Sequence, residues 1–304
     1  MSGGQIPLFY WEMEGKRERR PLSFILAVLL LTLALLAGGC GGKDSGVVRL
    51  AYVEWDTETA SAYVVREVLK DAGYKATVTP VDMQVMWQAV ASGKADAMAA
   101  AWLPTTHRAQ YETYRDRLTD LGPCLTGTKI GLVVPSYMKV RSIEDLSDEA
   151  GRHITGIEPG AGIMSLTERA LLSYPSLKGW TLDAASTGAM VTALRKAMDR
   201  KEPIIITGWA PHWMFSAYDL VFLDDPRGVY GGEEEIRTMV RKGFDKDNPG
   251  ACRILDRFSW TVSDMNEVML DIAGGMKPEK AARKWIDAHP DKVATWTEGV
   301  RKTA

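Results

Sequence analysis

The chain has 304 residues, of which 46% are hydrophobic and 25% are charged, a balance typical of a globular protein with a sizeable core. Its length corresponds to about two domains. The net charge of −2, and the lack of a Lys/Arg cluster after residue 46, argue against a nucleic-acid-binding protein. Ten tryptophans are the unusual feature, because each buried indole N–H needs an acceptor.

The first 40 residues have the pattern of an export signal. Basic residues between positions 16 and 20 precede the apolar run 22–37, and two glycines stand before Cys40. The run is shorter than the ~20 apolar residues of a spanning helix. We therefore predict a lipoprotein-type signal peptide at 1–40, lipidated at Cys40, and a flexible tether at 41–46. Plain cleavage and an uncleaved anchor remain alternatives, and the start at Met1 or Met13 stays open.

From residue 47 onward, short β-rich runs alternate with helical patterns. The predicted strands are 47–53, 76–81, 95–101, 129–135, 153–158, 181–185, 203–207 and 220–223. The predicted helices are 59–72, 83–92, 163–173 and 187–200, and the pattern is all helical from residue 248 to the end. Strands alternating with helices of this length are typical of α/β layers built on parallel sheets.

A weak internal repeat indicates two similar lobes. In each lobe a helix and a strand lead to a Trp-x-Pro segment, which begins at Trp102 in one and at Trp209 in the other. Ligands of open α/β sheets bind outside the carboxyl ends of strands, so two facing lobes would bring both tryptophans to one cleft. With crossings near 131–136 and 236–243, we predict lobe 1 at 47–135 plus 239–304 and lobe 2 at 136–238.

Several segments resemble the OpuAC-type family of glycine betaine-binding proteins. They are YVEWD (52–56), AWLPTTH (101–107), GIEPGAGIMSL (156–166), ITGWAPHWMF (206–215) and YDLVFLDDP (218–226). The resemblance extends over nearly all of residues 48–300. It implies a bilobal, periplasmic-binding-protein-like α/β fold (type II, Venus-flytrap) with two parallel or mixed-sheet lobes and a two-segment hinge. It also implies a substrate-binding protein of an ABC importer that captures glycine betaine by lobe closure.

The resemblance assigns a cage for the trimethylammonium group to Trp55, Trp102 and Trp209. A quaternary ammonium has no N–H to donate, so polar side chains gain little from it. Indole faces attract such a cation by ~0.5–2 kcal/mol per contact. The residue types therefore suit the ligand.

The resemblance assigns the ligand's carboxylate to the backbone amides of Gly162 and Ile163 and to the side chain of His107. Residues 160–165 follow a predicted strand and open a helix, whose N-terminus favours an anion. Read without the resemblance, this stretch is a truncated dinucleotide-binding motif or an ordinary strand-to-helix turn. The alternative for His107 is a surface histidine on a helix.

The remaining candidates are interpreted as structural. Glu233 to Glu235 are read as a solvated loop, and the pairing of Cys124 with Cys252 stays open. The other mature tryptophans and histidines are read as packing residues, with Trp213 as a possible neighbour of the site: Trp87, Trp180, Trp213, Trp260, Trp285, Trp296, His153, His212 and His289.

No nucleophile motif and no metal-ligand cluster appears, so we predict a protein that is not an enzyme and has no cofactor or metal. Its partners would be a separate permease and ATPase, with the chain anchored by lipid outside the cytoplasmic membrane. The alternatives are a choline-, carnitine- or proline betaine-binding protein. An envelope sensor or enzyme on the same fold is a further alternative.

Overall fold

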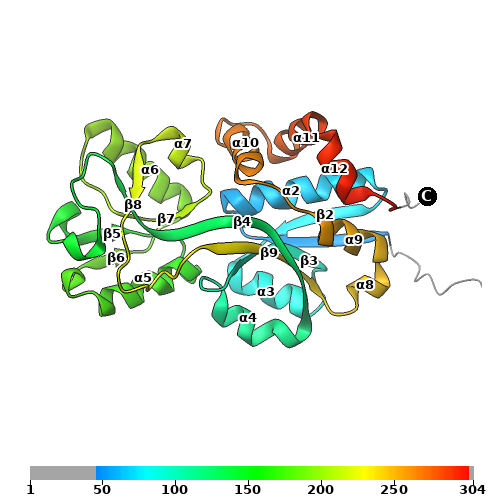
Figure 1. Ribbon diagram of the computed structural model, residues 1–304, viewed down its shortest axis with the longest axis horizontal. Helices are drawn as coiled ribbons and strands as arrows, with labels where there is room; N and C mark the ends of the chain where they lie inside the picture. Colours follow the sequence, from blue (N-terminus) through cyan, green and yellow to red (C-terminus); the bar gives the residue numbers. More distant parts are fainter. Residues whose placement is uncertain (1–45, 301–304) are drawn as a thin grey trace, which may run out of the picture. The chain divides into compact units, whose positions relative to one another are not determined.

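A nine-stranded mixed sheet runs through the protein in the computed structural model, which describes residues 46–300 (Figure 1). The strand order is β2-β1-β3-β9-β4-β7-β5-β6, and β8 pairs with β4. The strands are β1 (Val47–Tyr52), β2 (Lys75–Pro80), β3 (Ala97–Leu103), β4 (Leu118–Pro135), β5 (His153–Thr155), β6 (Thr181–Asp183), β7 (Ile206–Ala210), β8 (Leu220–Phe222) and β9 (Glu234–Arg241). The predicted signal peptide with Cys40 lies outside the described residues.

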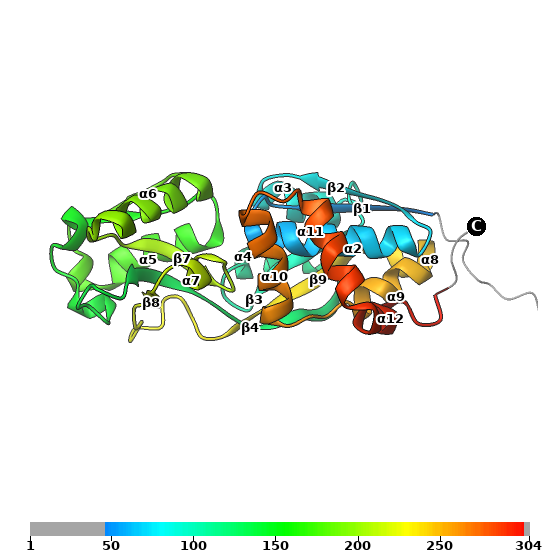
Figure 2. The same cartoon turned by 90° about the horizontal axis from the view of Figure 1, so that it is seen from above.

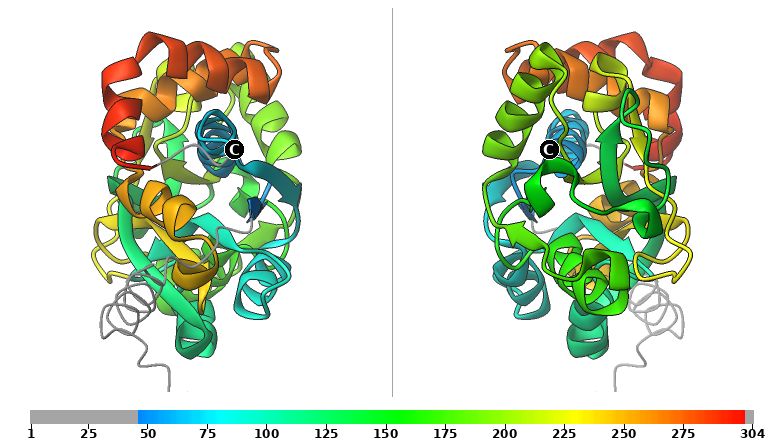
Figure 3. Two further views of the ribbon diagram at one scale, coloured as in Figure 1. Left: turned by 90° about the vertical axis from the view of Figure 1, so that its right-hand side faces the viewer. Right: turned by 90° about the vertical axis from the view of Figure 1, so that its left-hand side faces the viewer.

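Helices cover both faces of the sheet. They are α2 (Asp56–Asp71), α3 (Met83–Ala91), α4 (Arg108–Tyr114), α5 (Gly162–Ser173), α6 (Thr187–Arg200), α7 (Met214–Ala217), α8 (Phe244–Asp247), α9 (Pro249–Arg257), α10 (Val262–Ala273), α11 (Pro278–Ala288) and α12 (Pro290–Thr297), with short 3₁₀ helices at Arg115–Arg117, Ile143–Asp145, Glu149–Arg152 and Pro175–Leu177. Helices α10 and α11 pack on α2 on one side of the sheet, and α3 and α4 lie on the other (Figures 2 and 3). Within residues 46–300, no helix has the length and apolarity needed to cross a bilayer.

The long strand β4 belongs to both parts of the sheet. Through Thr128 it pairs antiparallel with β9, and from Lys129 onward it pairs antiparallel with β7. We call residues 46–128 and 234–300 the first half, and residues 129–233 the second half. The predicted lobe borders, after residues 135 and 238, lie a few residues further along the chain, and the division into lobes stays a prediction.

Two strand segments were not predicted from the sequence. The part of β4 before residue 129 contains Gly122, Pro123 and Gly127, and its pairing with β9 is interrupted by register shifts, so no regular alternation marks it. Strand β9 occupies the region that we expected to be a hinge. Strands β3 and β7 also extend further than predicted, so Trp102 and Trp209 lie inside them, opposite Ile236 and Ile130 respectively.

Aromatic packing stabilises the C-terminal helices of the first half. Trp285 stacks on Trp296 with 5.9 Å between ring centroids, and Trp260 meets Trp285 edge-on at 5.7 Å. All three are buried, as expected for packing residues. Cys124 and Cys252 are both buried and free, so they form no disulfide in this structure.

A buried carboxylate joins three strands of the first half. Asp96, directly before β3, accepts hydrogen bonds from the backbone N–H and guanidinium of Arg49 on β1 and from Nε of Arg241 on β9, at 2.8–2.9 Å. Burial alone would raise the pKa of Asp96, but the two guanidinium groups outweigh it and hold the pKa below its usual value.

Asp96→Ala is expected to lower the free energy of unfolding by about 2 kcal/mol, because it removes the buried acceptor of the Arg49 backbone N–H and of two partly exposed guanidinium groups. Urea unfolding at pH 7 measures this loss. Glu112→Ala is the control, since Glu112 forms an exposed i,i+4 pair with Arg108 and should cost less than ~0.5 kcal/mol. Equal losses in the two variants would contradict the role given to Asp96.

Candidate functional site

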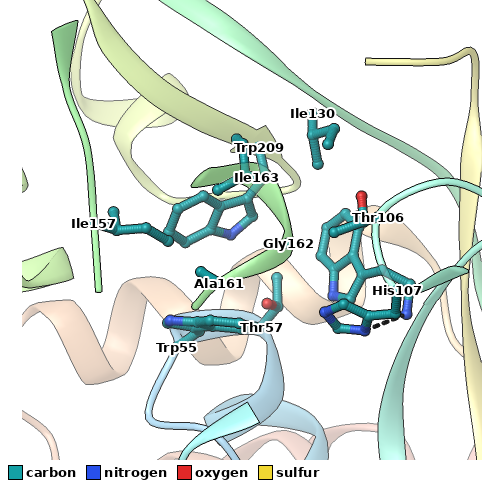
Figure 4. Close-up of a pocket in the computed structure, with 11 residues that line it drawn as sticks. Trp55, Thr57, Thr106, His107, Ile130, Ile157, Ala161, Gly162, Ile163 and Trp209 are labelled. Atoms are coloured by element: carbon teal, nitrogen blue, oxygen red, sulfur yellow. Dashed lines mark hydrogen bonds between the residues drawn. The ribbon is translucent and has the colours of Figure 1, made fainter. Parts of the chain in front are cut away.

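A small cavity lies between the two halves (Figure 4). The first half lines it with Trp55, Thr57, Trp102, Thr106 and His107, and the second half with Ile130, Ile157, Ala161, Gly162, Ile163 and Trp209. All six residues that the sequence analysis assigned to ligand contact are therefore brought to one cavity. Whether they contact a ligand stays a prediction.

Two of the three indoles are held by carboxylates. Trp55, the residue before α2, donates its ring N–H to Glu158 of the second half at 3.2 Å. Trp102 donates its ring N–H to Glu58 on α2 at 2.6 Å. These acceptors satisfy the polar edge of each ring, so the ring faces remain for contacts in the cavity.

Glu58 lies behind Trp102 and is almost fully buried. The Thr57 hydroxyl donates to its second oxygen at 2.6 Å. Burial raises the pKa of Glu58 to about 7, although the hydrogen bonds from Thr57 and Trp102 oppose the rise. The sequence analysis did not single out Glu58, because an acidic residue in the first turn of a helix is ordinary.

His107 presents a free donor. Its Nδ1 accepts the backbone N–H of Trp102 at 3.1 Å, so in the neutral ring the hydrogen is on Nε2, which has no partner within the described chain. Burial lowers the pKa of His107 to about 4, so the ring is neutral at pH 7. The His107 ring also lies in a stacked arrangement with the Trp55 ring, with 6.3 Å between the two centroids.

The N-terminus of α5 supplies backbone donors. Gly162 and Ile163 are its first residues, and the first amides of a helix have no acceptor within that helix. Gly162 lies so close to the first half that an added Cβ would stand 2.4 Å from the carbonyl oxygen of Thr106. A glycine is therefore needed where α5 meets the segment that carries His107.

Glu234 is a residue whose role we misread from the sequence. It is fully buried on β9, so the interpretation of 233–235 as a solvated loop is wrong for it. It accepts the backbone N–H groups of Thr105 at 2.6 Å and Thr106 at 2.7 Å, and also the Thr106 hydroxyl. These bonds hold the turn before His107. The alternation of buried Glu234, Ile236 and Thr238 is the strand signal that could have revealed it.

Other predicted residues lie outside the cavity lining. Trp87 and Trp180 are buried in the core. His212 is buried beside Trp209, with 4.8 Å between ring centroids, and Trp213 contacts the first half. Among residues 46–300, no group of three or more potential ligands could hold a metal ion.

Glu58→Gln is expected to stabilise the ligand-free protein at pH 8 but not at pH 5. Between pH ~4.5 and 7 the folded protein keeps a proton on Glu58 that the unfolded chain loses, so wild-type stability falls as pH rises through this window, by up to ~3 kcal/mol. Gln cannot ionise and still offers an oxygen to Trp102. The lowered pKa of His107 makes stability rise with pH instead, but His107 is present in both proteins, so its contribution cancels in the difference between them. Urea unfolding at both pH values tests this, and a difference that does not change with pH would contradict it.

Comparison with known proteins places the chain in a family. Residues 46–288 match OpuAC, the substrate-binding domain of ABC-type glycine betaine transport systems. The glycine betaine/carnitine transport binding protein GbuC of Listeria monocytogenes is 52% identical over 160 residues, which span 52% of this chain and only 53% of that relative.

Solved structures agree with this match. Lactococcal OpuAC, in its closed conformation complexed with glycine betaine, has a TM-score of 0.82 and 50% identity, and the alignment covers 83% of this chain and 99% of that one. A choline-binding protein of an ABC transporter in complex with choline has a TM-score of 0.79 and 27% identity, with 85% and 93% covered. The chain has the periplasmic-binding-protein fold and belongs to the OpuAC family of substrate-binding domains of ABC-type glycine betaine transport systems.

Proposed function

We propose that the chain binds glycine betaine in the cavity between its halves and is the substrate-binding protein of an ABC importer. One observation carries the proposal: the same small cavity is lined by three indoles and by donors that have no partner of their own. A ligand with a bulky cation at one end and a carboxylate at the other matches both features.

The indoles suit the cationic end. Trp55, Trp102 and Trp209 are buried, so a cation between them is largely removed from water. Each contact with a ring face contributes ~0.5–2 kcal/mol, and more when the site is dry. A primary ammonium would lose its hydrogen bonds to water without replacement, whereas a trimethylammonium group has none to lose.

The free donors suit the anionic end. The Nε2–H of His107 and the first amides of α5 line the same cavity, and Gly162 lies directly against Thr106, the neighbour of His107. Donors from both halves would thus converge on one carboxylate. Because they come from different halves, a bound carboxylate would favour the closed arrangement over an open one.

Choline is the second candidate, since the cavity would accept its head group equally well. Choline lacks a carboxylate, however, and would leave the His107 Nε2–H and the α5 amides unsatisfied, at a cost of ~1–3 kcal/mol for each buried donor. Isothermal titration with glycine betaine, proline betaine, carnitine and choline decides between them. Choline binding more tightly than glycine betaine would overturn the choice of ligand.

Trp209→Ala is expected to weaken glycine betaine binding at least tenfold while the protein stays folded, because one face of the site is lost. Trp209→Phe should lose less. Isothermal titration gives the affinities, and circular dichroism checks the fold. Trp180→Phe is the control for Trp209→Phe, since Trp180 is buried in the same half but does not line the cavity. An unchanged affinity in Trp209→Ala would exclude this site.

We propose that binding is not followed by a reaction. The lining side chains that carry polar atoms, apart from the indoles, are Thr57, Thr106 and His107. The Thr57 hydroxyl donates to Glu58, the Thr106 hydroxyl donates to Glu234, and Nδ1 of His107 accepts from the backbone. The two carboxylates also accept the Trp102 ring N–H and the backbone N–H of Thr105, so we interpret both hydroxyls as supports of the cavity lining and not as nucleophiles. Transport would then require a permease and an ATPase as separate chains.

We also propose that the chain is exported and anchored by a lipid at Cys40. This would place the two halves and the cavity between them outside the cytoplasmic membrane. The support is the basic segment, apolar run and small residues that precede Cys40 in the sequence. The Gly- and Ser-containing stretch 41–46 would link the anchor to β1.

Cys40→Ala is expected to release the protein from the membrane fraction of a bacterial host, because the attachment point of the lipid is removed. Partitioning with Triton X-114 measures this: the wild type should enter the detergent phase and the variant the aqueous phase. Ser45→Ala serves as a control in the tether. A Cys40→Ala variant that still partitions into detergent would count against the lipid anchor.

A further inference from the structure

Asp56, the first residue of α2, contacts two residues of the opposite half. Its Oδ1 accepts the ring N–H of Trp213 at 3.0 Å, and its Oδ2 lies 3.2 Å from Nε2 of His212. His212 and Trp213 follow β7, so these contacts join segments 157 residues apart in the chain. None of the three residues lines the cavity.

His212 is oriented for this contact by its own half. Its Nδ1 accepts the backbone N–H of Met214 at 3.1 Å, which leaves the ring hydrogen of the neutral form on Nε2, the atom nearest Asp56. The contact has the distance of an ion pair, and it is charged only when His212 is protonated. The side chain of His212 has no exposed surface.

The carboxylate of Asp56 is stabilised in its ionised form by these neighbours. Burial alone would raise the pKa of Asp56, but His212 and the Trp213 ring N–H together outweigh burial and lower it. A second contact, between Trp55 and Glu158 at 3.2 Å, crosses between the halves one residue earlier in the chain. The N-terminal turn of α2 therefore contacts the second half twice without any ligand.

We propose that Asp56 is a positioning residue that holds the two halves together, through Trp213 and His212, independently of the ligand. The contacts exist only while the halves are closed, so they add to the stability of the closed state and slow its opening. A ligand enclosed between the halves must wait for opening before it leaves. Asp56 thus influences the dissociation rate and the affinity of the ligand without contacting it. This effect on the ligand rests on the proposed function, whereas the effect on closure does not.

The test compares two single variants, their double variant and a control in the full chain. Asp56→Ala removes the acceptor, and Trp213→Phe removes the donor while it keeps an aromatic ring. His212 is left unchanged because it packs on Trp209. Asp82→Ala is the matched control, since Asp82 also stands at a helix N-terminus of the first half, is exposed, and makes no capping hydrogen bond.

Stopped-flow tryptophan fluorescence with glycine betaine should show dissociation about tenfold faster in Asp56→Ala and in Trp213→Phe, with little change in the association rate. The double variant should dissociate no faster than Asp56→Ala, because Asp56→Ala already removes the contact that Trp213→Phe removes. Asp82→Ala should match the wild type. A dissociation rate in Asp56→Ala equal to that of the wild type overturns the proposal.

A second measurement does not depend on the ligand. Spin labels at Glu112→Cys on α4 and Lys196→Cys on α6, both exposed helix positions, report the distance between the halves by double electron–electron resonance. Ligand-free Asp56→Ala should show a smaller closed population than the wild type. If the wild type does not bind glycine betaine, the proposed function fails, but this measurement still tests the role of Asp56. Equal closed populations in the ligand-free wild type and in Asp56→Ala would overturn that role.

Discussion

Carboxylates accept the ring N–H groups of two cavity indoles, and these hydrogen bonds determine that the ring faces are available for contact in the cavity. An acceptor offsets the free-energy cost of burying an indole N–H, and an N–H that faced the cavity would present a polar edge there. With Glu158 and Glu58 as acceptors, Trp55 and Trp102 present their faces. Because Glu158 belongs to the opposite half, Trp55 gains its acceptor only where the two halves meet.

Much of this arrangement could be predicted from the sequence. The alternation of strands and helices is a local signal, and it located most elements within a few residues. The repeated Trp-x-Pro segments indicated that Trp102 and Trp209 belong to equivalent strands, and both do end at one cavity. The resemblance supplied Trp55, His107 and the start of α5, since those segments carry their own motifs.

The residues that support the site could not be predicted in this way. Glu234 is 129 residues from the Thr105 amide that it accepts, and Glu58 is 44 residues from Trp102. Each is an acidic residue in a stretch where an acidic residue is unremarkable, and only the fold shows which donor it meets. The same holds for Asp56 and Trp213. Long-range pairing also explains why β9 was missed, since its partners are strands far away in the chain.

Four consecutive residues have different tasks: Trp55 directly before α2, and Asp56 to Glu58 in its first turn. Successive residues of a helix point about 100° apart, so Asp56 meets Trp213 and Glu58 meets Trp102 only in the present register. Substitutions there would alter one contact at a time. An insertion or deletion of a single residue before α2 would rotate all of them together, so natural variants and engineered chimaeras should preserve the length of this turn more strictly than its composition.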